Sequence, residues 1–177
     1  MSGKNRDDWR EKMKSKPFRY WIRDEIEQIV KEKNIDRSRF SEYSKFAYDE
    51  IIRRFYYSFI DYEKHPRVDL SNCWLHFREK DVTVLGRIGA RERQWPEFLH
   101  DLHALVPEPG NKKLYLILSQ GWVYHGYADE MLTVLNGTDG LLEDFYIVPQ
   151  SFDWVISYCD DGESAVLLQR NSTIQKA

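Results

Sequence analysis

The chain has 177 residues, 42% of them hydrophobic and 15% aromatic, which is enough apolar material for one folded core. This composition excludes an intrinsically disordered chain, and no apolar run of about 18 residues is present, so we expect no membrane span. The formal net charge of −3 is unevenly distributed, because residues 1–70 carry an excess of basic side chains and the rest of the chain an excess of acids.

The first residues, MSGKNRDDWREKMKSK, contain no apolar stretch typical of a secretory signal, so we expect a cytoplasmic protein. Cys73 and Cys159 are far apart in the sequence, and no CxxC pair occurs. The sequence alone leaves a disulfide between them open, but the expected compartment favours reduced, buried thiols.

Helices are expected in the first part of the chain. Apolar side chains recur at spacings of three and four near the N-terminus, and Pro17 divides this pattern into helices at about 7–15 and 17–33. A helix is also predicted over residues 38–62 by a stripe of apolar and aromatic side chains with a helical period. The stripe consists of Phe40, Tyr43, Phe46, Ala47, Ile51, Phe55, Phe59 and Tyr62. We interpret this stripe as core, with a partner-binding groove or a cofactor-binding site as the alternative.

The middle of the chain is expected to contain a hairpin and a short helix. The segments NCWLHF (72–77) and VTVLGRI (82–88) are predicted to pair around a polar turn, with Gly86 at a bulge or at the strand end. The Trp-Pro dipeptide at 95–96 begins the helix, because proline fits the first helical position. The buried side of this helix is predicted to consist of Phe98, Leu99, Leu102 and Leu105. The segment 107–113, which contains proline and glycine, is predicted to be a loop.

The last third of the chain combines strand patterns with one short helix. Residues 114–120 (LYLILSQ) are a continuous apolar run that predicts a central strand, and GWVYHGY after it either extends this strand or forms a second short one. An amphipathic helix is predicted over 128–136, with acids in its first turn. A strand over 145–148 follows. Residues 153–159 (DWVISYC) and 164–169 (SAVLLQ) are predicted to form a hairpin around the loop DDGE.

Together these elements predict an α+β fold in a single domain, residues 1–177. We expect N-terminal helices, within residues 1–65, packed on a mainly antiparallel sheet. The α+β part, residues 70–170, ends in a C-terminal β-hairpin. Most of the predicted strands can pair with their sequence neighbours as hairpins, and this favours antiparallel pairing.

Catalytic and metal-binding patterns are weak in this sequence. No phosphate-binding loop, serine nucleophile motif or cysteine-rich zinc pattern is present. His100 and His103 are spaced to reach one metal ion, but the sequence nominates no third ligand, so we interpret them as surface or half-buried histidines. Adjacent carboxylates are explained by turns and helix starts, and Cys159 is interpreted as an inert core thiol. We therefore predict no enzyme activity, no metal and no cofactor.

Basic side chains near the N-terminus are interleaved with aromatic ones, which is the pattern in this chain most favourable to nucleic-acid binding. Asp and Glu share the same helical turns, so a mixed-charge, solvated helix face is the better interpretation. We expect no nucleic-acid partner and no membrane partner. The sequence leaves the oligomeric state open.

Residues 121–177 are strongly acidic, with nine Asp and Glu side chains and only two basic ones, Arg170 and Lys176. A surface of one charge sign attracts partners of the opposite sign. We therefore expect this region to bind a basic protein, with solubility alone as the alternative interpretation. The predicted contact residues are the acids Asp129, Glu130, Asp153, Asp160, Asp161 and Glu163, with Trp122 and Tyr124 as aromatic anchors.

The segment FYIVPQSFDWVISYCDDGES contains an apolar strand, a short break, and an aromatic-x-Trp strand that leads into an acidic turn. This pattern resembles the terminal part of immunity proteins from bacterial polymorphic-toxin and contact-dependent growth inhibition systems. Upstream, LYLILSQGW and the helix over 128–136 fit the same layout, so the resemblance covers roughly residues 112–168. It implies a protein that binds and neutralises a cognate toxin, commonly a nuclease, and that has no catalytic residues.

The first hypothesis is thus a cytoplasmic immunity protein that binds a basic toxin domain through an acidic surface. The alternative is a non-catalytic interaction or regulatory module that uses the aromatic helix 38–62. An enzyme with His100 and His103 in a deep pocket is the third hypothesis. The first hypothesis requires the carboxylates to gather into one recognition area and not to be neutralised by basic side chains from the N-terminal part.

Overall fold

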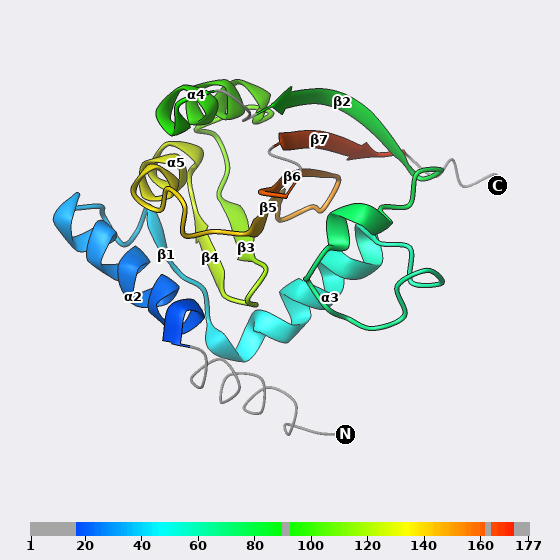
Figure 1. Ribbon diagram of the computed structural model, residues 1–177, viewed down its shortest axis with the longest axis horizontal. Coiled ribbons are helices and arrows are strands. Elements are labelled where there is room, and N and C mark those ends of the chain that lie inside the picture. Colours follow the sequence, from blue (N-terminus) through cyan, green and yellow to red (C-terminus); the bar gives the residue numbers. More distant parts are fainter. Residues whose placement is uncertain (1–16, 90–92, 162–163, 172–177) are drawn as a thin grey trace.

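A computed structural model describes residues 17–89, 93–161 and 164–171 of the chain. The strands are β1 (Phe40–Glu42), β2 (Val82–Gly89), β3 (Leu114–Leu118), β4 (Val123–Gly126), β5 (Asp144–Pro149), β6 (Trp154–Cys159) and β7 (Ser164–Arg170). The helices are α2 (Pro17–Glu32), α3 (Tyr48–Phe59), α4 (Trp95–Leu105) and α5 (Ala128–Gly137), with short 3₁₀ helices η1 (Lys45–Ala47) and η2 (Cys73–His76). The strands form one sheet in the order β1-β4-β3-β5-β6-β7-β2, and every neighbouring pair is antiparallel. This architecture confirms the predicted α+β class (Figure 1).

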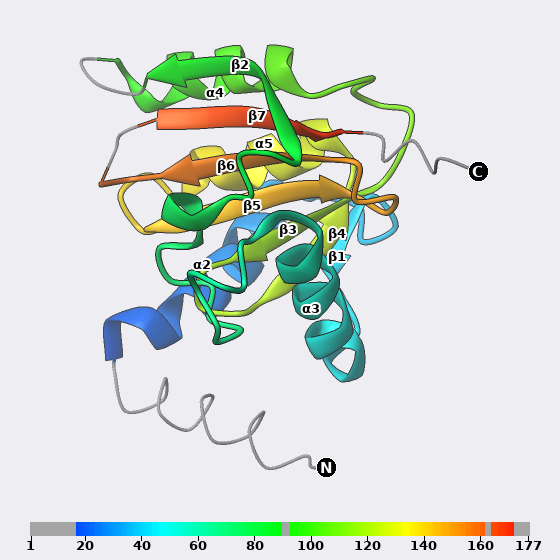
Figure 2. The same cartoon turned by 90° about the vertical axis from the view of Figure 1, so that its right-hand side faces the viewer.

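Helices cover both faces of the sheet (Figures 1 and 2). On one face, Trp95 of α4 packs against Tyr158 of β6, with 5.5 Å between the ring centroids. On the other face, Phe55 of α3 packs against Tyr146 of β5 at 4.6 Å. Tyr146 pairs with Ser157 in the register, so Tyr158, the next residue, points to the opposite face. Because both faces are covered, β3, β5 and β6 contain only buried residues.

Many predicted elements form where the sequence places them. Helix α4 begins at Trp95 with Pro96 in its first turn. The segment GWVYHGY contains the separate short strand β4, and α5 follows it. β6 and β7 pair as the predicted hairpin, with Trp154 opposite Gln169. Helix α2 corresponds to the second of the two predicted N-terminal helices, whereas the first, at about 7–15, lies outside the described residues.

The predicted helix over 38–62 is wrong in its first part. The chain there forms β1, which pairs with β4 at the sheet edge, and α3 begins only after it. Phe40 is fully buried and stacks on Tyr124, with 5.3 Å between the ring centroids. Gly126, opposite Phe40, permits this close approach, because a Cβ at that position would lie 2.4 Å from the carbonyl oxygen of Arg39. Packing of the edge strand thus outweighs the helical period of the sequence.

The predicted strand over 72–77 is also wrong. This segment contains η2, and Asn72 before it has a left-handed backbone with φ of 57°. The edge strand β2 therefore pairs with β7 rather than with the segment that precedes it. The β2–β7 register shifts between Val84 and Gly86, which confirms the predicted bulge.

Both cysteines are reduced and buried, as predicted. The thiol of Cys73 donates a hydrogen bond to the carbonyl oxygen of Asp69 at 2.7 Å. Burial raises the pKa of Cys73 to about 12, so this thiol stays protonated at neutral pH. Among the helices of the described residues, none is long and apolar enough to cross a membrane.

Candidate functional site

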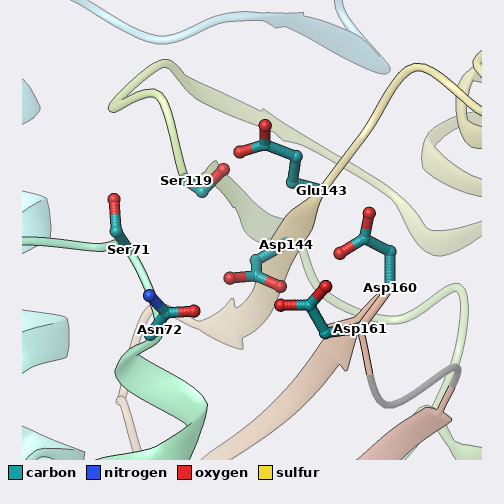
Figure 3. Close-up of a pocket in the computed structure, with 7 residues that line it drawn as sticks. All are labelled: Ser71, Asn72, Ser119, Glu143, Asp144, Asp160 and Asp161. Atoms are coloured by element: carbon teal, nitrogen blue, oxygen red, sulfur yellow. The ribbon is translucent and has the colours of Figure 1, made fainter.

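A pocket lined largely by carboxylates lies at one end of the sheet, where β5 begins and β6 ends (Figure 3). Its volume is about 300 Å³. The lining residues are Ser71, Asn72, Ser119, Glu143, Asp144, Asp160 and Asp161. We call this feature the acidic pocket. Its carboxylates come from the adjacent ends of two neighbouring antiparallel strands.

Backbone hydrogen bonds hold the walls of the acidic pocket together. The register of β5 and β6 places Asp144 directly opposite Cys159. Just beyond this pair, the amide N–H of Asp160 donates to the carbonyl oxygen of Glu143 at 3.0 Å. The amide N–H of Ser119, in the β3–β4 turn, donates to the carbonyl oxygen of Asp144 at 3.1 Å. The sheet therefore fixes the ends of three separate segments side by side.

Asp144 is the buried acid of the pocket, with 6% of its surface exposed. Its carboxylate lies within 4.8 Å of the sulfur of Cys159, and this thiol and the backbone of Asn72 both favour the ionised form. Burial and, after it, the charge of Asp160 raise the pKa of Asp144 to about 6. In mildly acidic solution Asp144 is thus partly protonated, whereas an ordinary aspartate is ionised there.

Asp160 lies nearer the surface of the pocket and is exposed. Burial raises the pKa of Asp160 above its usual value, and the charges of Asp161 and Glu143 act in the same direction. Within residues 17–89, 93–161 and 164–171, no Lys or Arg lines the pocket, and Asp144, Asp160 and Asp161 form no ion pair. In the described part of the chain, Asp144, Asp160 and Asp161 therefore present negative charge without a Lys or Arg partner, and a cation that enters the pocket would favour the ionised carboxylates.

Two of the predicted contact acids, Asp160 and Asp161, are brought together in this pocket. Asp153 is at the other end of β6, where it accepts a hydrogen bond from the hydroxyl of Ser151 at 2.6 Å. Glu163 lies outside the described residues. The predicted acids of the C-terminal hairpin are therefore divided between its two ends.

The predicted acids of α5 lie elsewhere. β3 runs toward the pocket and β4 runs away from it, so the first turn of α5 is beyond the far end of β4. Asp129 forms a hydrogen bond with a ring nitrogen of His103 at 2.7 Å. Glu130 accepts two hydrogen bonds from the guanidinium of Arg39, a residue of the N-terminal part. The prediction of one continuous acidic surface is therefore wrong, because its members are dispersed and one of them is neutralised.

The predicted aromatic anchors are core residues. Trp122 is 5% exposed and Tyr124 is fully buried, where it stacks on Phe40. β4 is not an edge strand, because β1 pairs with its outer side. Neither aromatic side chain is therefore available to anchor a partner at the surface, and the assignment of both as anchors is corrected.

Glu143 and Asp144 line the pocket but were not among the predicted contact residues. Their signal in the sequence is positional: Glu143-Asp144 begins one strand, and Asp160-Asp161 ends the next. Two consecutive antiparallel strands place these pairs side by side. Ser119 and Asn72 give no such signal, because only the folded sheet brings their segments to this end of it.

His100 and His103 do not line the acidic pocket. His100 is exposed, and His103 is half-buried beside Asp129. This placement agrees with their interpretation as surface or half-buried histidines. It gives the hypothesis of an enzyme with both histidines in a deep pocket no support from the described part of the chain.

Comparison with curated proteins gives no match, and comparison with solved structures gives none either. The model of a family of unknown function (DUF6756) matches residues 19–177, a span that includes every residue of the acidic pocket. The chain therefore belongs to this family of unknown function, DUF6756.

Proposed function

We propose that this protein is a non-catalytic immunity protein, which binds a basic domain of a cognate toxin at the acidic pocket. The observation that carries the proposal is the gathering of Glu143, Asp144, Asp160 and Asp161 around one pocket that no described Lys or Arg lines. Clustered carboxylates destabilise one another when all are ionised. A lysine or arginine side chain from a partner removes this repulsion and gains charge-assisted hydrogen bonds.

The location of the pocket supports an immunity role in particular. The segment that resembles immunity proteins, FYIVPQSFDWVISYCDDGES, supplies β5 from its second residue onward, all of β6, and Asp160 and Asp161. A nuclease toxin holds an anionic substrate, so its active site is basic. An inhibitor that presents fixed carboxylates to such a site gains both specificity and a faster encounter.

The proposed contact area is smaller than the surface expected from the sequence. It is centred on the acidic pocket and excludes Glu130, whose carboxylate is paired with Arg39. Trp122 and Tyr124 are excluded as well, since both are buried. Recognition then depends on a few fixed carboxylates rather than on the overall charge of the last third of the chain.

A growth assay tests this proposal. The protein is co-expressed with its cognate toxin domain, as wild type or with the double substitution Asp160→Lys and Asp161→Lys. We expect the wild type to protect the cells and the double variant to fail, because the inserted lysines repel the basic toxin. Asp153→Lys, at the other end of β6, is the matched control and keeps protection. Equal protection by the double variant and the control would refute the pocket as the contact site.

A second candidate function is an interaction module that uses α3. Tyr57 and Tyr62 are each 52% exposed and contact each other, with 6.4 Å between the ring centroids. Other members of the aromatic stripe argue against this alternative. Phe55 and Phe59 are fully buried and cannot contact a partner. Replacing Tyr57 and Tyr62 by serine would abolish partner binding under this alternative, and would leave it intact if the acidic pocket is the contact site.

A further inference from the structure

We propose that Asp144, Cys159 and Asp160 form a binding site for a divalent cation, suited to Zn²⁺, at the acidic pocket, which Asp144 and Asp160 line. The metal site itself is independent of the proposed function. Only its regulatory role rests on that function, because the cation would occupy the pocket that binds the partner. A bound cation would neutralise the carboxylates that attract the basic partner. Metal and partner would then compete.

The geometry of the three side chains carries the proposal. Their donor atoms, a carboxylate oxygen from each aspartate and the sulfur of the cysteine, all lie within 4.8 Å of one another. Asp144 and Cys159 are fixed as a cross-strand pair, and Asp160 follows Cys159 directly. Ligands of a tetrahedral zinc ion are closer together, since each lies about 2.0–2.3 Å from the metal. Asp160 is exposed in a turn, so it can supply the small inward movement.

The donor set selects the kind of metal. A thiolate with two carboxylates suits Zn²⁺, which accepts sulfur and oxygen ligands with low coordination number. Ca²⁺ and Mg²⁺ prefer oxygen ligands alone, so Cys159 would not serve them. Three protein ligands leave one position of a tetrahedral zinc ion for water or for a further side chain.

Burial without a cationic partner supports a cation at this place. Asp144 is 6% exposed, and no Lys, Arg or His of the described residues pairs with it. Buried carboxylates in proteins are usually paired, protonated or bound to a metal. A zinc ion would hold Asp144 ionised and would remove the proton from the thiol of Cys159.

The β3–β4 turn gives an independent indication that a ligand belongs here. The hydroxyl oxygen of Ser119, which lines the pocket, is buried and has no hydrogen-bond partner in the described structure. Buried polar atoms without partners are rare in folded proteins. A metal-bound water in the pocket would give the Ser119 hydroxyl the partner that it lacks.

Titration with Zn²⁺ alone tests the site. The full-length protein is first treated with a chelator, and binding is then measured by calorimetry for the wild type and for Asp160→Asn, Cys159→Ser and Asp153→Asn. We expect one Zn²⁺ per wild-type chain and an affinity lower by roughly 10- to 100-fold or more in the two pocket variants. Asp153→Asn, the control from the other end of β6, should match the wild type.

A spectroscopic readout identifies the sulfur ligand. Cd²⁺ bound to the wild type should show the ultraviolet charge-transfer band of a cadmium–thiolate bond, and Cys159→Ser should lose it. Asp160→Asn keeps the test valid if Cys159→Ser does not fold. The proposal is overturned if the wild type binds no Zn²⁺, or if Asp160→Asn binds it as tightly as the wild type. Partner binding is measured separately in chelator, so a failure of the metal site is distinguishable from a failure of the proposed function.

Discussion

Asp144 and Cys159 face each other across the β5–β6 ladder, and the Asp144 carboxylate lies within 4.8 Å of the Cys159 sulfur. Asp144 is the buried acid of the acidic pocket, and Asp160 adds a second carboxylate to the same cluster. An acid held in such surroundings favours its protonated form. Asp144 should therefore make its own contribution to the pH dependence of the protein's stability.

The first prediction concerns this dependence. Asp144 has an ordinary pKa of 3.8 in the unfolded chain and a pKa of about 6 in the folded protein. The folded state binds the proton more tightly, so the contribution of Asp144 to stability is greatest below the unfolded value and is lost as the pH rises toward the folded value. We expect the unfolding free energy of the wild type, relative to Asp144→Asn, to fall by roughly 1–3 kcal/mol between pH about 4 and about 7. Urea unfolding of both proteins across this range measures it, and a difference that is constant with pH would contradict it.

The second prediction tests whether Tyr124 is core rather than a surface anchor. Its side chain is fully buried and its hydroxyl has no hydrogen-bond partner among the described residues. Tyr124→Phe should therefore change the unfolding free energy by about 1 kcal/mol or less, and a gain in stability is possible within that range. Tyr124→Ala should cost about 3–5 kcal/mol, because it leaves a cavity beside Phe40. Chemical unfolding gives both values. A stable Tyr124→Ala variant with weakened partner binding would instead restore its assignment as an anchor.

The sheet was predictable from sequence where the local pattern and the tertiary structure agree. The sequence of β6 and β7 shows two apolar strands joined by a turn, and β3 is a continuous apolar run. All three strands were therefore predicted. β1 was missed because Phe40 fits a helical stripe, and only its stacking on Tyr124 makes it part of a strand. The segment at 72–77 has a strand-like composition, but Asn72 turns the backbone into η2.

The acidic pocket was only half predictable for a similar reason. The sequence displays Asp160-Asp161 in a turn, and this much follows from hairpin chemistry. The proximity of Asp144 depends on β5 pairing with β6, and Ser119 arrives through the pairing of β3 with β5. The acids of α5 were grouped with Asp160 and Asp161 because they lie in the same acidic region of the sequence, residues 121–177. Sequence charge does not reveal at which end of the sheet a helix begins.

The third prediction concerns the close contact that admits β1 to the sheet. A Cβ added at Gly126 would lie 2.4 Å from the carbonyl oxygen of Arg39, and backbone cannot move away as a flexible side chain can. Gly126→Ala should therefore destabilise the protein by about 1–3 kcal/mol. Gly89→Ala is the matched control in a strand, since a Cβ there meets nothing within 4 Å. We expect thermal or urea unfolding to show a change of about 0.5 kcal/mol or less for the control. Equal effects of the two substitutions would mean that the β1–β4 approach is looser than described.

The fourth prediction separates the α5 acids from the contact site. Glu130 is paired with Arg39, so its charge is already compensated. Glu130→Gln should leave the affinity for the toxin domain unchanged and should lower the unfolding free energy only slightly, because solvent screens a partly exposed ion pair. Affinity is measured by calorimetric titration. A large loss of affinity in this variant would show that α5 is part of the recognition surface.

The affinity for the cognate toxin domain, measured by titration in the presence of a chelator, tests the role of the acidic pocket most directly. Asp160→Lys should weaken binding by about 2 kcal/mol or more, which is roughly 30-fold or more in Kd. Asp153→Lys, which makes the same charge change at the other end of β6, should leave the Kd close to that of the wild type. Equal Kd values for the wild type and Asp160→Lys would contradict the assignment of this pocket as the site of recognition.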